Sequence, residues 1–154
     1  KGVCEVANDN SNSQIILSGD KSAIDEISEI LKKNKKKSIP LPVSAPFHCS
    51  LMKPAARNME KNIIKTKFYD PSVQIVSNVT AQATTNSDKI KKLLIEQIFS
   101  KVRWRESVEY MINNGVKEFV EIGPGKVLSG LIKRINDKVL SKSVNTIDEI
   151  KNLK

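Results

Sequence analysis

The sequence is poor in the residues that build metal sites and disulfide frameworks. It contains one histidine and two cysteines in 154 residues, and Cys4 and Cys49 lie far apart. We therefore expect neither a zinc site nor a disulfide scaffold. No apolar run approaches the length that spans a bilayer, and the first residues show no signal-peptide pattern. Because the chain begins with Lys1 inside an apparent strand, we interpret it as a fragment of a longer protein.

Aromatic residues are also scarce, at 5%, although the formal net charge is +9. The densest basic run covers residues 32–37. A basic patch alone supplies only sequence-independent attraction to nucleic acid, and no stacking motif accompanies this one. We therefore favour a solvated, lysine-rich surface over a specific nucleic-acid site. The frequent Lys, Asn and Ile are typical of an AT-rich genome, and an acidic protein partner stays possible.

The single histidine, His48, lies in a proline-rich segment over residues 42–55. Each proline biases its predecessor away from the α region, so the approach to His48 is predicted to be extended. The pattern then becomes helical, with Ser50 as a helix cap and Pro54 inside the first turn. We predict His48 on a strand-to-helix loop, where a rigid scaffold can present a reactive imidazole. A purely structural loop histidine is the alternative explanation.

Residues 1–42 show the pattern of a small α/β unit. We predict strands over 2–7 and 14–19, with a polar turn between them. A helix follows, beginning with a capping-box-like pair, Ser22 and Asp25, and residues 37–41 return as a strand. The order strand, strand, helix, strand is most of a ferredoxin-like unit.

Residues 43–154 alternate between helical and strand periods. The first predicted helix begins at residue 52 and stops near residues 68–71. Further helices are predicted over 90–98, 104–112 and 127–135, and Thr146 with Glu149 caps a terminal helix. The predicted strands occupy 73–76, 119–122 and 143–144, and residues 82–87 are predicted as a polar connection. Strands separated by helices indicate a parallel sheet with helices on its faces, so the predicted fold class is α/β.

The histidine segment resembles that of the malonyl-CoA:acyl carrier protein transacylases, serine acyltransferases of fatty-acid and polyketide synthesis. Phe47-His48, followed by Ser50-Leu51-Met52-Lys53-Pro54-Ala55, carries the likeness, and the segments 104–111 and 121–128 extend it over nearly the whole chain. The resemblance implies an α/β-hydrolase-like core over 43–154. It also implies that 1–42 are the C-terminal part of a ferredoxin-like small subdomain.

The nucleophile of that family is missing from this sequence. Serine acyl transfer needs a nucleophile, a base and a group that orients the base, and the serine usually lies in a Gly-x-Ser-x-Gly turn. The loop Gly123-Pro124-Gly125 has no nucleophile between its glycines, so we interpret it as a tight strand-to-helix turn. The resemblance implies that the serine, an oxyanion-hole glutamine and a malonyl-binding arginine lie in an N-terminal half. We therefore expect the chain alone to be inactive and to need that half as a partner.

The resemblance assigns roles to only a few residues. His48 matches the catalytic histidine, which takes the serine proton and later protonates the thiol leaving group. Gln97 matches the position whose main-chain carbonyl orients that histidine. A bulky Phe47 goes with malonyl rather than methylmalonyl, although a methyl-sized difference discriminates by only about 1–3 kcal/mol. The implied substrate-binding residues are Asn8, Asn10, Gln14, Phe47 and Asn78.

The basic surface then acquires a predicted partner. Acyl carrier proteins are acidic, so a positive groove would steer their docking. The predicted docking residues are Lys36, Lys37, Lys133 and Arg134, and the first two are also candidates for coenzyme A phosphates. Malonyl-CoA is the implied substrate, and no metal or other cofactor is implied.

These features predict the histidine-bearing half of a malonyl transferase of fatty-acid synthesis. Two alternatives stay open: an acyltransferase domain of a larger synthase, and a non-catalytic basic binding module. The resemblance and the AT-rich composition imply an intracellular location, in a bacterial cytoplasm or in a plastid-type organelle such as an apicoplast.

Overall fold

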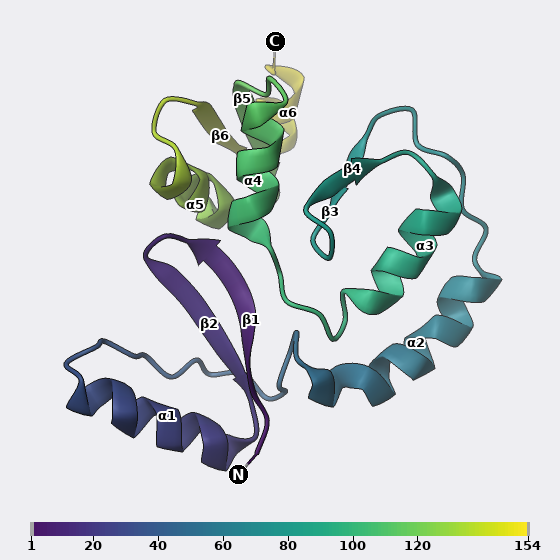
Figure 1. Ribbon diagram of the computed structural model, residues 1–154. Helices are drawn as coiled ribbons and strands as arrows, with labels where there is room; N and C mark the ends of the chain where they lie inside the picture. The colour runs from purple at the N-terminus through teal and green to yellow at the C-terminus, as the bar shows by residue number, and fades with distance from the viewer. Residues whose placement is uncertain (1, 154) are drawn as a thin grey trace.

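Three groups of elements follow one another along the chain in the computed structural model, which describes residues 2–153 (Figure 1). The first group is an antiparallel hairpin with one helix: β1 (Cys4–Ser11), β2 (Gln14–Gly19) and α1 (Lys21–Lys33). The second combines two helices with a short hairpin: η1 (Ser50–Met52), α2 (Lys53–Lys65), β3 (Ile75–Ser77), β4 (Gln82–Thr84) and α3 (Ser87–Glu96). The third holds α4 (Trp104–Asn113), β5 (Glu118–Ile122), α5 (Val127–Ile135), β6 (Leu140–Val144) and α6 (Ile147–Lys151).

β1 is longer than its apolar pattern predicts. The polar cluster over 8–13 was predicted as a turn, and this is wrong for residues 8–11, because β1 continues to Ser11 and pairs with β2 from Cys4↔Gly19 to Ser11↔Gln14; Asn12 and Ser13 form the turn. The Asp9 N–H donates to the Val102 carbonyl at 2.9 Å. The polar end of β1 is therefore held by a hydrogen bond to a segment that is distant in the sequence. The prediction for β2 is confirmed.

The predicted capping box of α1 is also wrong. The helix begins after Asp20, whose carboxylate accepts a hydrogen bond from the Val3 N–H at 2.7 Å and does not cap the helix with its side chain. The exposed Asp25 pairs with Lys21 one turn earlier at 2.9 Å.

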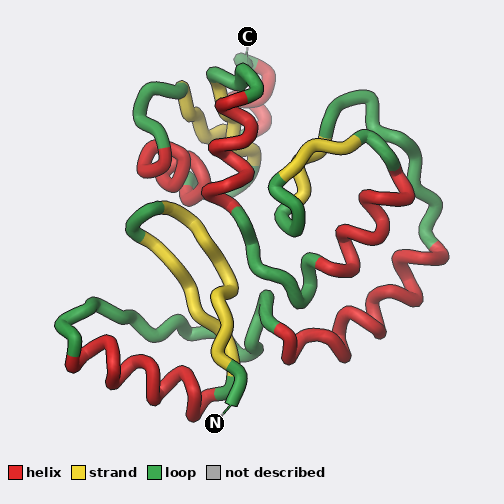
Figure 2. The backbone as a smooth tube through the Cα atoms, in the orientation of Figure 1, coloured by secondary structure: helices red, strands yellow, loops and turns green. Residues whose placement is uncertain are grey.

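The strand predicted over 37–41 does not form. Residues 36–43 have no regular structure, and the irregular connection from α1 to η1 crosses the base of the β1–β2 hairpin (Figure 2). Its side chains over 37–41 are exposed, so no apolar face holds the segment against a neighbouring strand. The ferredoxin-like unit is therefore not completed within residues 2–153. The boundary predicted between residues 42 and 43 lies inside this connection.

The second group places α3 between α2 and the β3–β4 hairpin (Figure 1). The prediction of an unstructured connection over 82–87 is wrong at its start, because β4 pairs antiparallel with β3. The hairpin turn contains Ala81, which is buried with a positive φ of 52°. Strands of three residues are too short to show a period in the sequence.

In the third group, β5 and β6 are parallel neighbours joined through α5, in register from Glu118↔Leu140 to Ile122↔Val144. The turn after β5 uses Gly123 and Gly125 at φ values of 138° and 94°, which favour glycine. The predicted cap of the last helix is confirmed: the Thr146 hydroxyl accepts from the Glu149 N–H, and the Glu149 carboxylate accepts from the Thr146 N–H.

The predicted mixture of helices and strands is confirmed, but the continuous parallel sheet is not found. Residues 2–153 contain three two-stranded sheets, and only β5–β6 is parallel. The structure therefore shows a mixed α/β chain without an α/β-hydrolase core of its own. No helix of the described residues has the length and apolar character needed to cross a membrane.

The buried apolar side chains are few and mostly small. They are Ala7, Cys49, Ala56, Ala81, Leu93, Val108, Leu131, Ile132 and Val144. Several large apolar side chains are exposed instead, among them Ile122 at 67% and Val127 at 72%. The interior is therefore thin, and much apolar surface is left on the outside.

Candidate functional site

His48 lies on the loop directly before η1, with its ring partly exposed. Its φ of 58° is in the left-handed region, which is uncommon for a residue with a side chain and has to be held by neighbours. One such neighbour is Cys49, which is fully buried and donates its thiol hydrogen to the Pro46 carbonyl at 3.2 Å. The prediction that His48 lies on a loop before a helix is confirmed, but the strand predicted before that loop does not form.

The second neighbour is the main chain of Gln97. Its carbonyl oxygen lies 3.1 Å from Nδ1 of His48. Gln97 directly follows α3, and its own N–H donates to the Leu93 carbonyl at 2.9 Å, so the end of the helix fixes the acceptor. A carbonyl can only accept, so Nδ1 carries the hydrogen and Nε2 of the neutral imidazole is left as an acceptor. The ring is thus arranged to take up a proton at Nε2.

The loop is also held by Glu5 of β1, a residue that belongs to no motif in the sequence. Its carboxylate accepts hydrogen bonds from Ser50, from the N–H at 2.9 Å and from the hydroxyl through the other oxygen. These bonds, together with the charge of Lys53, hold the pKa of Glu5 below its usual value. Ser50 was predicted as a helix cap, and this is wrong: α2 begins at Lys53, and Ser50 is held by Glu5. No local pattern could have revealed a contact between residues 45 positions apart.

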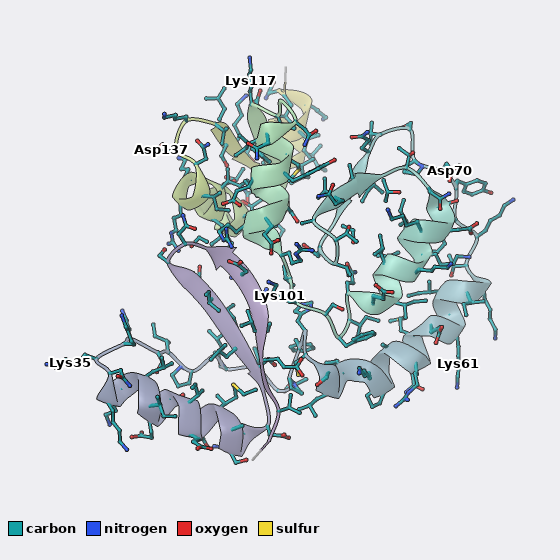
Figure 3. The ribbon with its side chains drawn as sticks, in the orientation of Figure 1. Lys35, Lys61, Asp70, Lys101, Lys117 and Asp137 are labelled. Atoms are coloured by element: carbon teal, nitrogen blue, oxygen red, sulfur yellow. The ribbon has the colours of Figure 1, made fainter. Side chains whose placement is uncertain are left out.

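β1 also binds the segment that leads from α3 to α4. The Val102 N–H donates to the Ala7 carbonyl at 2.8 Å, and the Val102 carbonyl accepts from Asp9. Asn8 forms an isolated parallel bridge with Val102. Lys101, the preceding residue, lies between the β1–β2 hairpin and the end of α3 (Figure 3).

An ion pair strengthens this junction. The Arg105 guanidinium donates to both carboxylate oxygens of Asp9, at 3.1 and 2.8 Å, and also reaches Glu109. Asp9 is nearly buried, at 8% exposure. Hydrogen bonds to the Asp9 carboxylate, together with its charge, raise the pKa of Arg105, so the guanidinium stays charged. A bidentate contact of this kind fixes the orientation of the guanidinium as well as its distance from the carboxylate.

A second ion pair lies at the start of α4. Arg103 donates to Glu106 through two nitrogens, and its remaining nitrogen donates to the Val79 carbonyl at 3.2 Å. The guanidinium lowers the pKa of Glu106 to about 2. Arg103 thereby ties the β3–β4 turn, which carries Asn78, to α4.

The structure distributes the predicted substrate-binding residues over four places. Asn8 and Asn10 lie in the second half of β1, and Asn10 is buried at 8% exposure. Asn78 lies in the turn between β3 and β4. Phe47 precedes His48 and is 47% exposed. Their roles in binding stay predictions.

Gln14 lies away from His48, at the far end of the β1–β2 hairpin. It accepts a hydrogen bond from Arg134 of α5 at 3.4 Å. A predicted substrate residue and a predicted docking residue therefore touch each other.

The predicted docking residues fall into two separate pairs. Lys36 and Lys37 follow α1, and both are exposed. Lys133 and Arg134 lie in the last turn of α5, also exposed. Figure 3 labels the neighbouring Lys35 at the outer end of α1, whereas α5 lies at the turn of the β1–β2 hairpin (Figure 1). The four residues therefore do not form one patch, and Arg134 is hydrogen-bonded to the β1–β2 hairpin. Among residues 2–153, no group of three or more His, Cys, Asp or Glu side chains could hold a metal ion.

Comparison with known proteins gives a consistent result. The chain is 42% identical over 144 residues to the malonyl CoA-acyl carrier protein transacylase of Escherichia coli strain K12, covering 93% of this chain and 47% of the relative. It superposes with a TM-score of 0.93 on an acyl carrier protein S-malonyltransferase from Vibrio cholerae, at 40% identity, over 99% of this chain and 50% of that one.

A further solved structure is a malonyl-transacylase in complex with its type II PKS acyl-carrier protein. Its TM-score is 0.90 at 36% identity, over 97% of this chain and 49% of the other. The chain thus spans about half the length of the relatives that it matches. No family model matches it.

Proposed function

Because the chain is homologous to malonyl CoA-acyl carrier protein transacylases over about half of their length, we propose that it supplies the histidine half of such an enzyme. The complete enzyme transfers a malonyl group from malonyl-CoA, through a serine ester, to the thiol of an acyl carrier protein. The observation that carries this proposal is the contact between Nδ1 of His48 and the main-chain carbonyl of Gln97. That contact leaves Nε2 free to act as a general base.

His48 acts twice in the proposed reaction. Its Nε2 takes the hydroxyl proton of the serine as the serine oxygen attacks the malonyl thioester carbon. The tetrahedral intermediate collapses with rupture of the carbon–sulfur bond, and the same nitrogen returns the proton to the departing coenzyme A thiolate. Transfer to the carrier thiol runs these steps in reverse, with the carrier sulfur as nucleophile. The Gln97 carbonyl faces the imidazolium in each half-reaction, in the place of a triad carboxylate.

The missing serine belongs to a second half that packs on this chain. Exposed apolar side chains support this proposal, in particular Val120, Ile122 and Leu140, which lie on one face of the β5–β6 sheet. A sheet that exposes large apolar side chains on one face normally packs against another layer. The chain alone is therefore inactive in this scheme.

Acyl carrier protein docks, in the proposal, near Lys133 and Arg134. Both are exposed on α5, and a positive surface attracts an acidic partner. Charge reversal of both residues is expected to raise KM for the carrier protein and to leave KM for malonyl-CoA unchanged. Equal changes in KM for the carrier protein and KM for malonyl-CoA would refute the docking role. Lys36 and Lys37, which follow α1, are reversed in the same way as the matched comparison.

We assign malonyl selection to Phe47 and the lining of the acyl channel to Asn8 and Asn10, followed by Gln14, and we place Asn78 near the site. The support is their position, since Phe47 directly precedes His48 and Asn8 lies opposite Val102. A fatty-acid synthesis enzyme of this kind acts inside the cell, where coenzyme A thioesters and carrier protein are made.

The test uses the assembled enzyme, by which we mean this chain joined to the serine-bearing half of a bacterial relative. Incubation with malonyl-CoA is expected to add one malonyl group to the intact mass, and the isolated chain is expected to gain none. His48→Ala should slow adduct formation by about 100- to 10,000-fold, the usual range for loss of a general base. Gln97→Ala should keep most of the rate, because its contact comes from the main chain. Undiminished labelling of His48→Ala would refute the proposal.

A further inference from the structure

The loop that carries His48 needs support on both sides. A left-handed backbone at a residue with a side chain costs free energy and persists only when the surroundings hold it. On the N-terminal side, the buried thiol of Cys49 reaches back to the Pro46 carbonyl. On the C-terminal side, Ser50 is held in place, because its N–H and its hydroxyl both donate hydrogen bonds to Glu5.

Glu5 reaches this loop from a different part of the molecule. It lies in β1, 45 residues earlier in the chain, and its two oxygens engage Ser50 from the strand. Lys53, one turn further along, adds a favourable charge near the same carboxylate. A contact with two acceptor oxygens fixes the orientation of Ser50, and through the peptide of Cys49 it restricts the backbone of His48.

The same strand also positions the partner of the imidazole. Two residues beyond Glu5, the Ala7 carbonyl accepts from Val102, and Asp9 donates back to Val102. Val102 follows Gln97 by five residues, so β1 binds the segment that begins with the Gln97 carbonyl. One strand thus holds both sides of the His48–Gln97 contact, the histidine through Glu5 and the carbonyl through its backbone.

We infer that Glu5 is a positioning residue for His48: through Ser50 it fixes the loop so that Nδ1 meets the Gln97 carbonyl and Nε2 faces the reacting serine. This inference rests on the proposed function and adds a residue to it. Glu5 touches neither substrate nor serine in this role. It acts by hydrogen bonds, so its charge is secondary.

The test compares three substitutions at Glu5 in the assembled enzyme. Glu5→Ala removes both acceptors, and Glu5→Asp shortens the side chain so that it no longer reaches Ser50. Glu5→Gln keeps the length, with an amide oxygen that accepts from the Ser50 N–H and an amide nitrogen that donates to the hydroxyl. Glu26→Gln on the exposed face of α1 is the matched control for the loss of one negative charge.

We expect Glu5→Ala and Glu5→Asp to lower kcat for malonyl transfer by about 10- to 100-fold, the scale of a misplaced catalytic group, with KM for malonyl-CoA unchanged. Glu5→Gln should stay within a few-fold of the parent, like the control. Ser50→Ala, which keeps the N–H but loses the hydroxyl, should fall between them. The inference is overturned if Glu5→Ala and Glu5→Asp keep the parent kcat, or if Glu5→Gln is as slow as Glu5→Ala.

A spectroscopic measurement separates this inference from the proposed function. The chain has a single histidine, so nitrogen-15 labelling of this half alone gives two ring-nitrogen signals, both from His48. In the parent they should be widely separated, as for one fixed tautomer, and Glu5→Ala should bring them together. If His48→Ala leaves malonyl transfer intact, the proposed function fails, but the nitrogen signals still show whether Glu5 orients the ring. Unchanged signals in Glu5→Ala would refute the positioning role whatever the activity.

Discussion

Two regions differ in how far the chain covers its own side chains. One is the junction between β1 and α4, and the other is the β5–β6 sheet. At the junction, the chain buries a polar group and supplies its partner: Asp9 is nearly buried and forms an ion pair with Arg105. In the sheet, α5 covers one face, where the Ser129 hydroxyl donates to the Lys142 carbonyl at 3.1 Å. The opposite face leaves Ile122 67% exposed and Leu140 62% exposed.

The two regions therefore differ in whether contacts within this chain are enough to hold their geometry. The geometry around His48 depends on contacts that residues 2–153 make among themselves, through Glu5, Gln97 and Val102. The sheet leaves Ile122 and Leu140 largely exposed on one face, although Val144 beside Ile122 is buried. We therefore expect the junction to resist separation from the second half, and the sheet to depend on it.

The largest effect is expected from breaking the junction. Asp9→Ala leaves the partly buried Arg105 without its main partner, and should lower the free energy of unfolding of the assembled enzyme by about 3 kcal/mol. Urea denaturation measures this loss. The exposed Lys21–Asp25 pair is the matched comparison, and Lys21→Ala should cost about 0.5 kcal/mol or less. Equal losses in the two variants would mean that the junction is no more self-sufficient than the surface.

The apolar face of the sheet is the next target. Ile122→Lys places a charge where we expect the second half to pack, and should weaken association of separately produced halves on the order of 100-fold. Ile39→Lys is the control, because Ile39 is equally exposed, at 67%, but lies in the irregular connection before η1. Calorimetric titration of one half with the other measures both. If both substitutions weaken association alike, the sheet face is not the main contact.

Acid should loosen the start of α4. The Arg103 guanidinium holds the pKa of Glu106 at about 2, below its ordinary value of 4.5. A lowered pKa contributes stability that is fully present above about pH 4.5 and is lost as the pH falls toward 2. Because the side chain is 29% exposed, we expect a contribution on the order of 1–2 kcal/mol. Glu106→Gln should therefore flatten the dependence of unfolding free energy on pH between 5 and 3, whereas Glu29→Gln on α1 should not.

The smallest effects are expected from two glycines of the sheet region. Gly125 has a φ of 94°, so Gly125→Ala should destabilise the assembled enzyme by about 1 kcal/mol. Gly130 lies within α5, and an added Cβ would meet nothing within 4 Å, so Gly130→Ala should stabilise it by about 0.5–1 kcal/mol. Thermal unfolding compares the two. Shifts of the same sign would contradict the assignment of these backbones.

Local patterns predicted the elements that carry their own signals. The capping box of α6 and the strand β2 lie within a few residues of the groups that stabilise them, so the sequence is sufficient there. β1 beyond residue 7 could not be predicted, because its partner Arg105 is 96 residues away and its own residues are polar. The strand predicted over 37–41 has suitable residues but no neighbour among residues 2–153 to pair with.

The site divides in the same way. The resemblance implied that the Gln97 carbonyl faces His48, and the two atoms lie 3.1 Å apart, although the catalytic roles of both residues stay proposals. Glu5 was missed because alternation along a strand says only which face a side chain occupies. Its contact with Ser50 depends on how β1 lies against the loop, which no short pattern encodes.

The single tryptophan, Trp104, gives this architecture a built-in optical reporter. It begins α4 between Arg103, which reaches Val79, and Arg105, which reaches Asp9, and its indole N–H is buried without a hydrogen-bond partner in residues 2–153. An indole shielded from water emits at shorter wavelength than one in contact with it. Loosening of either ion pair should therefore shift the fluorescence of this half to the red, before the rest of the fold melts.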